Sequence, residues 1–427
     1  MASDDQVILA LGFAAICDIE IMKAKKRKIW QRKWLQRRTQ LECYENLMKE
    51  LALEDSESYR RFLRMDVSTF EELVALVSPS IERNNTSMRE AIPAAERIAS
   101  IYITQLLQCI KNILLFISSE TQSSLSYQFR IAQNTISGII PAVCSAIYHH
   151  LGSEIQVPES ENEWKMVAEE FWAKWNFPLC LGAMDRKHIR IKPPPHSGAT
   201  YRNYKGFFSI VLLAVVVANL KFLYVDVGTN GRVSDRGVWG KSKLRQAITN
   251  GDMNIPEAAA LPGLASNLPF VIVADDAFPL MPNIMKPYPG SNLSKECLIF
   301  NYRLSRARRV SKNAFGILAA RFRVFGTTIL TSVPNTKLIV LAACSLHNFL
   351  TNRSKNTYIP EDSADREDIL NGVLIEGNWR QNTNQLISCQ RISSRGSNYA
   401  KDVRDRFCNF FNAEGAVPWQ DNNYTLH

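Results

Sequence analysis

The sequence predicts an α/β fold whose sheet lies in the second half of the chain, after a helical region. Three observations support this prediction. Apolar residues before Pro178 recur at helical spacing, those after it form short runs typical of strands, and helical spacing returns further on. The chain has 427 residues, of which 46% are hydrophobic and 22% charged, which is typical of a globular protein of two or three domains. These values exclude a disordered or collagen-like chain.

The region before residue 178 contains two clear helical patterns. Residues 70–77 (FEELVALV) follow Ser68, a typical N-cap, and residues 135–151 carry Ile, Val or Leu every three or four positions. The segment 123–147 has the outline of a helix-turn-helix with a tight turn near Ala132. An ordinary helical hairpin explains the same pattern, so both readings stay open.

After Pro178 the elements follow an α/β order. Residues 179–191, 210–217 and 221–227 predict an antiparallel meander of three strands, followed by a loop over 228–237. A helix over 242–248, a strand over 270–275, and helices over 305–325, 335–350 and 398–412 come next. This order matches the ribonuclease-H-like layout. We divide the chain into a basic N-terminal segment (1–58), a helical region (59–177), the α/β domain (178–350) and a polar, loop-rich extension (351–427).

The positive charge of the chain is concentrated in one segment. The formal net charge is +10, and residues 23–38 alone contain nine Lys and Arg and no acidic residue. A nuclear-import signal or an arm that contacts nucleic-acid phosphates fits this segment, and a solvated helix whose Trp30 and Trp34 pack on the protein is the alternative. The candidate nucleic-acid-binding residues are Lys25, Lys26, Arg27, Lys28, Arg32, Lys33, Arg37 and Arg38.

The chain shows no sign of secretion or membrane insertion. The apolar run 7–17 follows Asp4 and Asp5 where a signal peptide needs positive charge, and eleven residues are too few to span a bilayer. The nine cysteines form no C-x-x-C pair, so we expect reduced thiols in an intracellular protein.

Four acidic residues lie on or just after predicted strands: Asp185, Asp235, Asp275 and Asp276. Side chains at the ends of neighbouring strands converge in open α/β sheets, and Mg²⁺ or Mn²⁺ prefers carboxylate ligands. Two ions could clamp the attacking and leaving oxygens of a phosphodiester. A single Asp at a strand end is more often a cap or a solvated residue, so only the set as a whole predicts a metal site.

Several ordered blocks resemble one family. Residues 61–65 (RFLRM), 175–189 (WNFPLCLGAMDRKHI), 222–235 (FLYVDVGTNGRVSD) and 273–280 (VADDAFPL) are similar to the PIF/Harbinger transposases and the nucleases derived from them, and further blocks extend the likeness from about Tyr59 to Trp419. The resemblance implies a ribonuclease-H-like DDE endonuclease domain that cuts or joins DNA with Mg²⁺ or Mn²⁺. It places catalytic acids at Asp185 and Asp275, and metal ligands at Asp185, Asp235 and Asp275.

The chain departs from this family at the fourth acidic position. The family usually carries a Glu on the helix that reads ARRVSKNAFGIL here, and this chain has Lys312 at that degenerate catalytic position. Arg186 replaces the usual Gly, and Val217 replaces a common Asp. An ammonium group beside a cation site repels the metal, or it pairs with Asp185 or Asp275 and closes the site. Metal binding is therefore expected to be weakened or lost.

Two functions follow from these observations. One is a Harbinger-derived nuclease whose activity is in doubt because of Lys312, and the other is a catalytically inactive DNA-binding or adaptor protein. We expect DNA as the partner, a separate Myb-like protein as a second partner implied by the resemblance, and neither a membrane nor a small-molecule substrate. The nucleus is the expected compartment, with the cytoplasm second.

Overall fold

A computed structural model describes residues 32–424 apart from 88–89, 103–125, 234, 262, 264–266, 370–372, 382–385 and 389–395. The helical region comprises α2 (Lys33–Gln36), α3 (Arg38–Leu41), η1 (Tyr44–Met48), α4 (Lys49–Glu54), α5 (Ser56–Leu63), α6 (Val67–Ile81), α7 (Ala94–Ile101), α9 (Gln133–Leu151), η3 (Gly152–Glu154) and α10 (Glu161–Trp175). The α/β region contains β1 (Cys180–Arg190), β2 (Ser209–Val216), β3 (Phe222–Asn230), α11 (Asp235–Lys241), α12 (Lys243–Asn250), β4 (Ala259–Ala260), β5 (Asn267–Leu268), β6 (Val271–Ala274), β7 (Ile284–Met285), α13 (Lys295–Arg321), η4 (Arg323–Gly326) and α14 (Val333–Arg353). The C-terminal part has α15 (Lys355–Tyr358), β8 (Arg366–Asp368), β9 (Val373–Ile375), η5 (Asn378–Gln381), β10 (Ile387–Ser388), α16 (Asn398–Asn412) and α17 (Gln420–Asn423).

The main sheet is mixed, with strand order β3-β2-β1-β6-β7. The first three strands are antiparallel, which confirms the predicted meander, and β6 and β7 run parallel to β1. All eight side chains of β2 are buried, because this Val- and Leu-rich strand lies inside the sheet and is covered on both faces. The chain therefore has the mixed α/β architecture that the sequence predicts.

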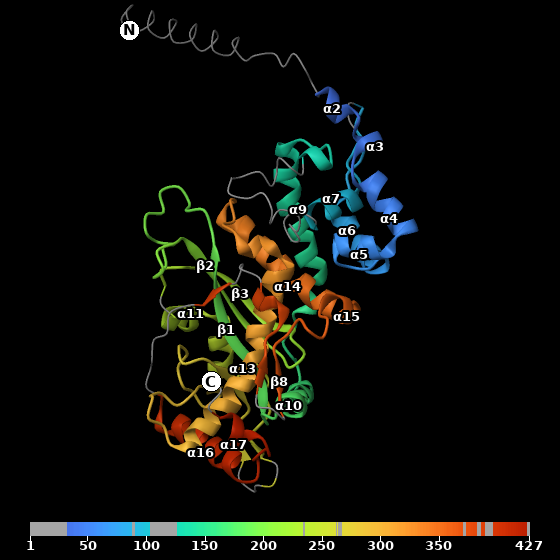
Figure 1. Cartoon of the computed structure of the whole chain (residues 1–427). Helices are drawn as coiled ribbons and strands as arrows, with labels where there is room; N and C mark the ends of the chain where they lie inside the picture. The colour runs from blue at the N-terminus through green and yellow to red at the C-terminus, as the bar shows by residue number, and fades with distance from the viewer. Residues whose placement is uncertain are drawn as a thin grey trace, which may run out of the picture.

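Two long helices cover one face of the sheet (Figure 1). Helix α13 packs against β1, β2 and β6, and α14 packs against β3. On the opposite face, Val238 of α11 packs against Val211 of β2. The helical region joins this layer through α9, which packs against α14, α6 and α7. Buried residues of both regions belong to one continuous hydrophobic core.

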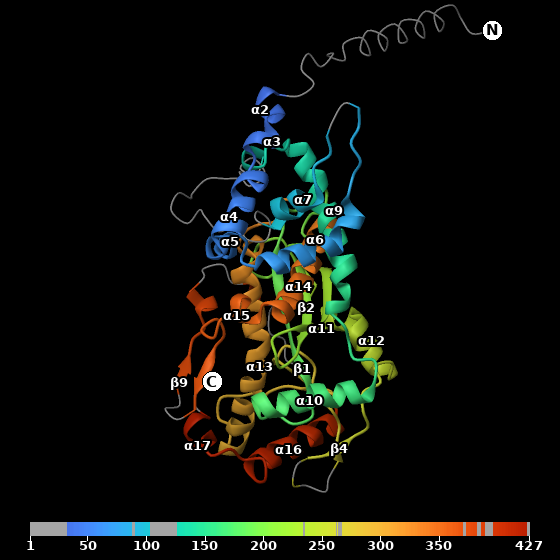
Figure 2. The same cartoon turned by 90° about the vertical axis from the view of Figure 1, so that its right-hand side faces the viewer.

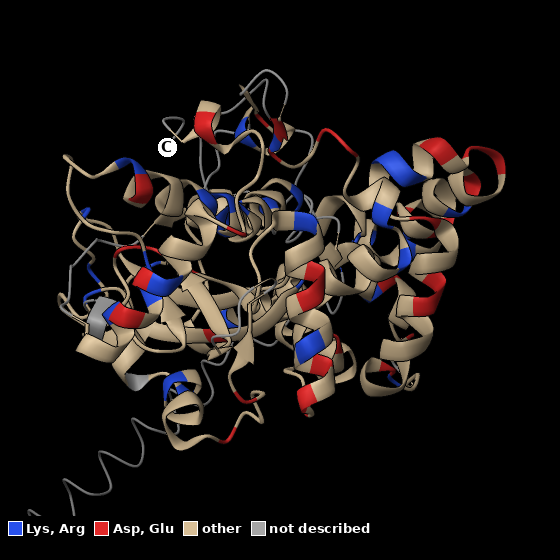
Figure 3. Ribbon diagram, turned by 90° about the horizontal axis from the view of Figure 1, so that it is seen from below, with Lys and Arg blue, Asp and Glu red and all other residues tan. Residues whose placement is uncertain are grey.

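The helix-turn-helix remains a prediction. Residues 126–128 are helical and the predicted turn lies just before α9, while residues 103–125 lie outside the described part of the chain. The apolar face of α9, which includes Ile136, Ile140, Val143 and Ile147, is buried in the core, as its spacing predicts. Figure 3 shows acidic and basic residues interleaved over the helices of this region.

The predicted loop over 228–237 is partly wrong, because β3 continues to Asn230 and α11 begins at Asp235. Helix α13 begins ten residues earlier than the pattern over 305–325 indicates. Its start is set by Ser294, whose side chain accepts the backbone N–H of Cys297, a cap that the apolar periodicity does not reveal.

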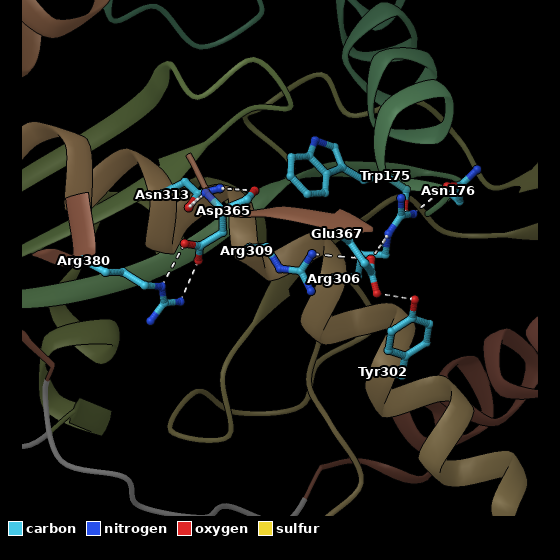
Figure 4. A network of polar contacts seen from close by, with 9 residues as sticks. All are labelled: Trp175, Asn176, Tyr302, Arg306, Arg309, Asn313, Asp365, Glu367 and Arg380. Carbon is cyan, nitrogen blue, oxygen red and sulfur yellow. Dashed lines mark hydrogen bonds and ion pairs between the residues drawn. The ribbon is translucent and has the colours of Figure 1, made fainter. Parts of the chain in front are cut away.

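The C-terminal part is tied to α13 by buried ionic groups (Figure 4). Glu367 of β8 pairs with Arg306 (2.8 Å) and Arg309 (3.4 Å), and accepts a hydrogen bond from Tyr302 (2.6 Å). Next to it, the backbone N–H of buried Asp365 donates to Asn313 Oδ1 of α13 at 3.0 Å, and the Asp365 carboxylate accepts two hydrogen bonds from Arg380 within the extension, at 2.8 and 2.6 Å. These contacts hold the extension against the main helix of the sheet layer.

Within the part of the chain that the structure describes, no helix is long and apolar enough to cross a membrane.

Candidate functional site

The structure brings Asp185 and Asp275 together at one position of the sheet. Met184 of β1 is the register partner of Ala274, the last residue of β6, so each aspartate is the next residue on a parallel neighbour. Neighbouring strands lie about 4.8 Å apart, and side chains at matched positions of parallel strands point to the same face. Both carboxylates therefore face α13, as expected if they serve one site.

Asp185 is buried, and each of its carboxylate oxygens has a polar partner. Its Oδ2 lies 2.9 Å from Lys187 Nζ, and its Oδ1 accepts the backbone N–H of Arg186 at 2.7 Å. Burial alone would raise the pKa of Asp185, but the charges of Lys187 and Arg308 outweigh burial and hold that pKa below its ordinary value. The carboxylate is therefore ionised and already neutralised by protein cations.

Asp275 has a cation of its own. Arg308 Nη2 lies 3.8 Å from its Oδ2, and its Oδ1 accepts the backbone N–H of Ala277 at 3.0 Å. Arg308 also acts on Asp185 through its charge, so this guanidinium group stands near both carboxylates. The neighbouring Asp276 pairs instead with buried Lys286 at 3.1 Å.

Lys312 stands one helical turn after Arg308, on the same side of α13. Its side chain has access to solvent, yet the surrounding protein and the repulsion of Arg308 lower the pKa of Lys312 to about 8. Among the described residues no carboxylate oxygen lies within 4.0 Å of its amine. The prediction that Lys312 pairs with Asp185 or Asp275 is wrong, because Lys187 and Arg308 make those contacts.

Lys187 and Arg308 are the site residues that the sequence reasoning missed. Both have a sequence signal: Lys187 lies two residues after Asp185 and so shares its face of the strand, and Arg308 lies four residues before Lys312 on the helix. A third contribution to the site, from strand β10, could not be predicted from the local sequence. The short strand β10 pairs with β1 at Lys187 and His188, and Ser388 Oγ accepts a hydrogen bond from Lys187 Nζ at 2.8 Å.

Asp235 is the first residue of α11, in the connection that follows β3. β3 runs parallel to β1, so this connection leaves the sheet at the end to which β1 points. The side chain of Asp235 lies outside the described residues, and its predicted role as a metal ligand stays a prediction.

Two histidines have structural contacts. His188 forms a hydrogen bond with the side chain of Ser209, and buried His347 forms hydrogen bonds with Tyr358 and the carbonyl of Leu220.

The basic segment is described only from Arg32 onward, and Lys25, Lys26, Arg27 and Lys28 lie outside the described residues. Arg32, Lys33 and Arg37 are exposed. Arg38 forms an ion pair with buried Glu96, which makes it part of the helical region rather than a free cation. Trp34 contacts Tyr127 in a tilted arrangement with ring centroids 5.7 Å apart, as the alternative expects for this tryptophan, and Trp30 lies outside the described residues.

The donor set does not fit a divalent cation. No group of three side chains able to hold a metal occurs among the described residues. More directly, the two carboxylates at the site face the cations Lys187, Arg308 and Lys312, so the site carries excess positive charge. A divalent ion 4 Å from one ammonium group is repelled by roughly 8 kcal/mol at an effective dielectric constant of about 20.

Comparison with known proteins defines the class to which this fold and site belong. Residues 184–348, from β1 to α14, match the family model described as DDE superfamily endonuclease. A DDE domain implies a ribonuclease-H-like fold, and the matched range contains Asp185, Asp235, Asp275 and Lys312. No solved structure matches the chain.

Two curated relatives narrow this class. The chain is 25% identical over 298 residues to "Protein ALP1-like" of Arabidopsis thaliana, covering 68% of each chain. It is 24% identical over 283 residues to "Putative nuclease HARBI1" of Rattus norvegicus, covering 65% of this chain and 72% of that protein. Residues 184–348 therefore form a DDE superfamily endonuclease domain, and the two relatives support the Harbinger-derived nuclease family that the sequence blocks indicate.

Proposed function

We propose that this protein binds DNA on an inherited ribonuclease-H-like DDE scaffold and does not cleave it. The observation that carries the proposal is the ion pair between Lys187 and Asp185, together with Arg308 beside Asp275. These cations stand where a nuclease would hold Mg²⁺ or Mn²⁺ to activate water against a phosphodiester. The same excess of positive charge suits a bound phosphate backbone, which needs no metal.

The proposal includes the cell compartment and the partners. A DNA-binding protein of this ancestry acts in the nucleus, and the basic segment 23–38 supports import and phosphate contact there. A Myb-like partner protein is proposed on the family resemblance alone.

Deletion of residues 23–38 tests the role of the basic segment. If this segment touches phosphates, the deletion should make DNA affinity less dependent on salt, and an unchanged dependence would show that the segment does not contact DNA.

A graded set of variants tests the loss of cleavage. We expect neither plasmid nicking nor tight Mn²⁺ binding from the natural chain, and none from Lys312→Glu, because two cations remain at the aspartates. The triple variant Lys187→Ser, Arg308→Gln, Lys312→Glu should bind Mn²⁺, and adding Asp185→Ala should abolish that binding. Calorimetry with Mn²⁺ and a supercoiled-plasmid assay are the measurements.

The second candidate is an active nuclease. It is favoured by the matched register of Asp185 and Asp275, because a metal that displaced Lys187 would find two carboxylates on one face. Robust Mg²⁺-dependent nicking by the natural chain, lost in Asp185→Ala, would establish this candidate and refute the proposal.

A further inference from the structure

An arginine-rich pocket lies about two turns beyond Lys312, at the C-terminal end of α13. It has a volume of about 520 Å³ and is formed by α5, the end of α13, η4 and the segment that follows α15. Figure 2 shows α5 and α15 gathered around this end of the helix. Five arginines from three elements line the pocket: Arg60, Arg61, Arg64, Arg321 and Arg323.

The pocket carries more positive than negative charge. Asp362 is its one acidic lining residue. Outside the lining, Asp66 pairs with Arg60 at 2.6 Å and Glu57 pairs with Arg61, so three carboxylates stand against five guanidinium groups. Arg64, Arg321 and Arg323 are left with one carboxylate, Asp362, among these groups.

Arg321 and Arg323 form no close ion pair of their own in the part of the chain that the structure describes. Among the described residues neither has a carboxylate oxygen within 4.0 Å. Arg321 lies over the ring of Tyr358 at 5.7 Å. The Nε of Arg323 is buried and has no hydrogen-bond partner within the described part of the chain. A buried donor without an acceptor is costly, and a bound oxyanion would supply the acceptor.

The pocket and the candidate site lie on the same helix, α13, with Trp379 packed against the helix between them. Arg308, Lys312, Gly316 and Ala320 are spaced four residues apart along the helix, and Ala320 lines the pocket. At Gly316 the ring of Trp379, another lining residue, lies so close that an added Cβ would meet it at 2.2 Å. At a rise of 1.5 Å per residue this row spans about 18 Å, so the pocket is a place separate from the aspartate site.

We propose that the arginine pocket binds phosphate groups of the DNA backbone. The inference rests on the DNA-binding function proposed above. Guanidinium groups match phosphate oxygens in a two-pronged arrangement, and several of them around one hollow are suited to a polyanion. The side chains of Arg60 and Arg61 are 46% and 75% exposed, so the lining is open to a DNA strand that lies on the surface.

The test compares arginine variants in the full chain. Arg61→Gln with Arg323→Gln removes two charges while leaving Arg321 and the end of α13 in place. Arg406→Gln is the matched control: Arg406 pairs with Asp402 one turn before it on α16, just as Arg61 pairs with Glu57 on α5. Helix α16 lies at the other end of the molecule (Figure 1). The probe is a fluorescein-labelled 20-base-pair duplex, followed by anisotropy from 50 to 200 mM salt.

We expect the double variant to bind the duplex roughly tenfold more weakly and to lose about one to two units from the slope of log K against log salt. Arg406→Gln should match the natural chain, and Arg61→Lys with Arg323→Lys should retain the salt slope because the charges remain. Thermal unfolding confirms that each variant is folded. A double variant with natural affinity and slope would overturn the inference, whereas a natural chain that fails to bind the duplex would overturn the proposed function itself.

Discussion

The ion pair between Lys187 and Asp185 makes the sharpest prediction about stability. Replacing Lys187 by Met leaves a buried carboxylate without its nearest cation. At 2.9 Å the attraction is about 6 kcal/mol for an effective dielectric constant of about 20. Arg308 and the backbone N–H of Arg186 still support the carboxylate, so we expect a loss of about 3 kcal/mol, the lower end for a broken buried pair. Asp185→Asn with Lys187→Met should recover most of that loss.

Urea unfolding of the two single variants and the double variant at pH 7.5 gives the coupling energy. The control is the pair between Lys295 and Asp421, which has the same 2.9 Å separation but an exposed position on the surface. We expect no resolvable coupling there, because water screens exposed charges. Equal coupling in the two cycles, or single effects at Asp185 and Lys187 that simply add, would refute the reasoning.

The pH dependence of this pair follows from the lowered pKa of Asp185. A carboxyl whose folded pKa lies below its ordinary value of 3.8 stabilises the fold above that pH and loses its contribution as the pH falls further. In Lys187→Met, burial should instead raise the pKa of Asp185. The natural chain should therefore exceed Lys187→Met in free energy of unfolding by the whole amount at pH 7.5, and this difference should shrink towards pH 4. A difference that grows on acidification would contradict this account.

Three further predictions concern α13 and its contacts. The amine of Lys312, with its pKa of about 8, should react with an acylating reagent at pH 8 faster than ordinary lysines do, and mass spectrometry of the labelled peptide reads this out. Glu367→Gln leaves Arg306 and Arg309 without their carboxylate and should cost about 3 kcal/mol, with faster trypsin cleavage in the C-terminal part; unchanged cleavage would argue against the anchoring role. Gly316→Ala would stabilise an open helix by about 1 kcal/mol, but here it should destabilise by about 1–3 kcal/mol and shift tryptophan emission, because the added methyl group meets Trp379.

Local patterns in the sequence determined most of the sheet layer. The three runs predicted as strands after Pro178 form β1, β2 and β3, and the pattern over 398–412 forms α16 with the same bounds. These predictions work because side-chain periodicity reports which face of an element is buried, and burial is the main driving force for forming it. Errors occur where a cap decides the boundary, as at Ser294.

The sequence also indicated that Asp185 and Asp275 share one site, because both stand on apolar strands of an α/β domain. It could not identify which cations would neutralise them. Lys312 was the evident candidate from the family pattern, but the packing of α13 on the sheet places Arg308 at Asp275, and the alternation of β1 places Lys187 at Asp185. Charge pairs form between whichever groups the tertiary packing brings within a few ångströms, and this distance is not written in the local sequence.

The arginine pocket shows most clearly what local sequence patterns could not predict. Its five arginines come from parts of the chain more than 250 residues apart in sequence, and its wall includes Trp379 from a region that reads only as polar. Composition and periodicity determined the class of fold, the position of the aspartates and the basic character of the chain. Tertiary structure alone decided which charges meet, because the convergence of distant segments is fixed by the packing of the whole core.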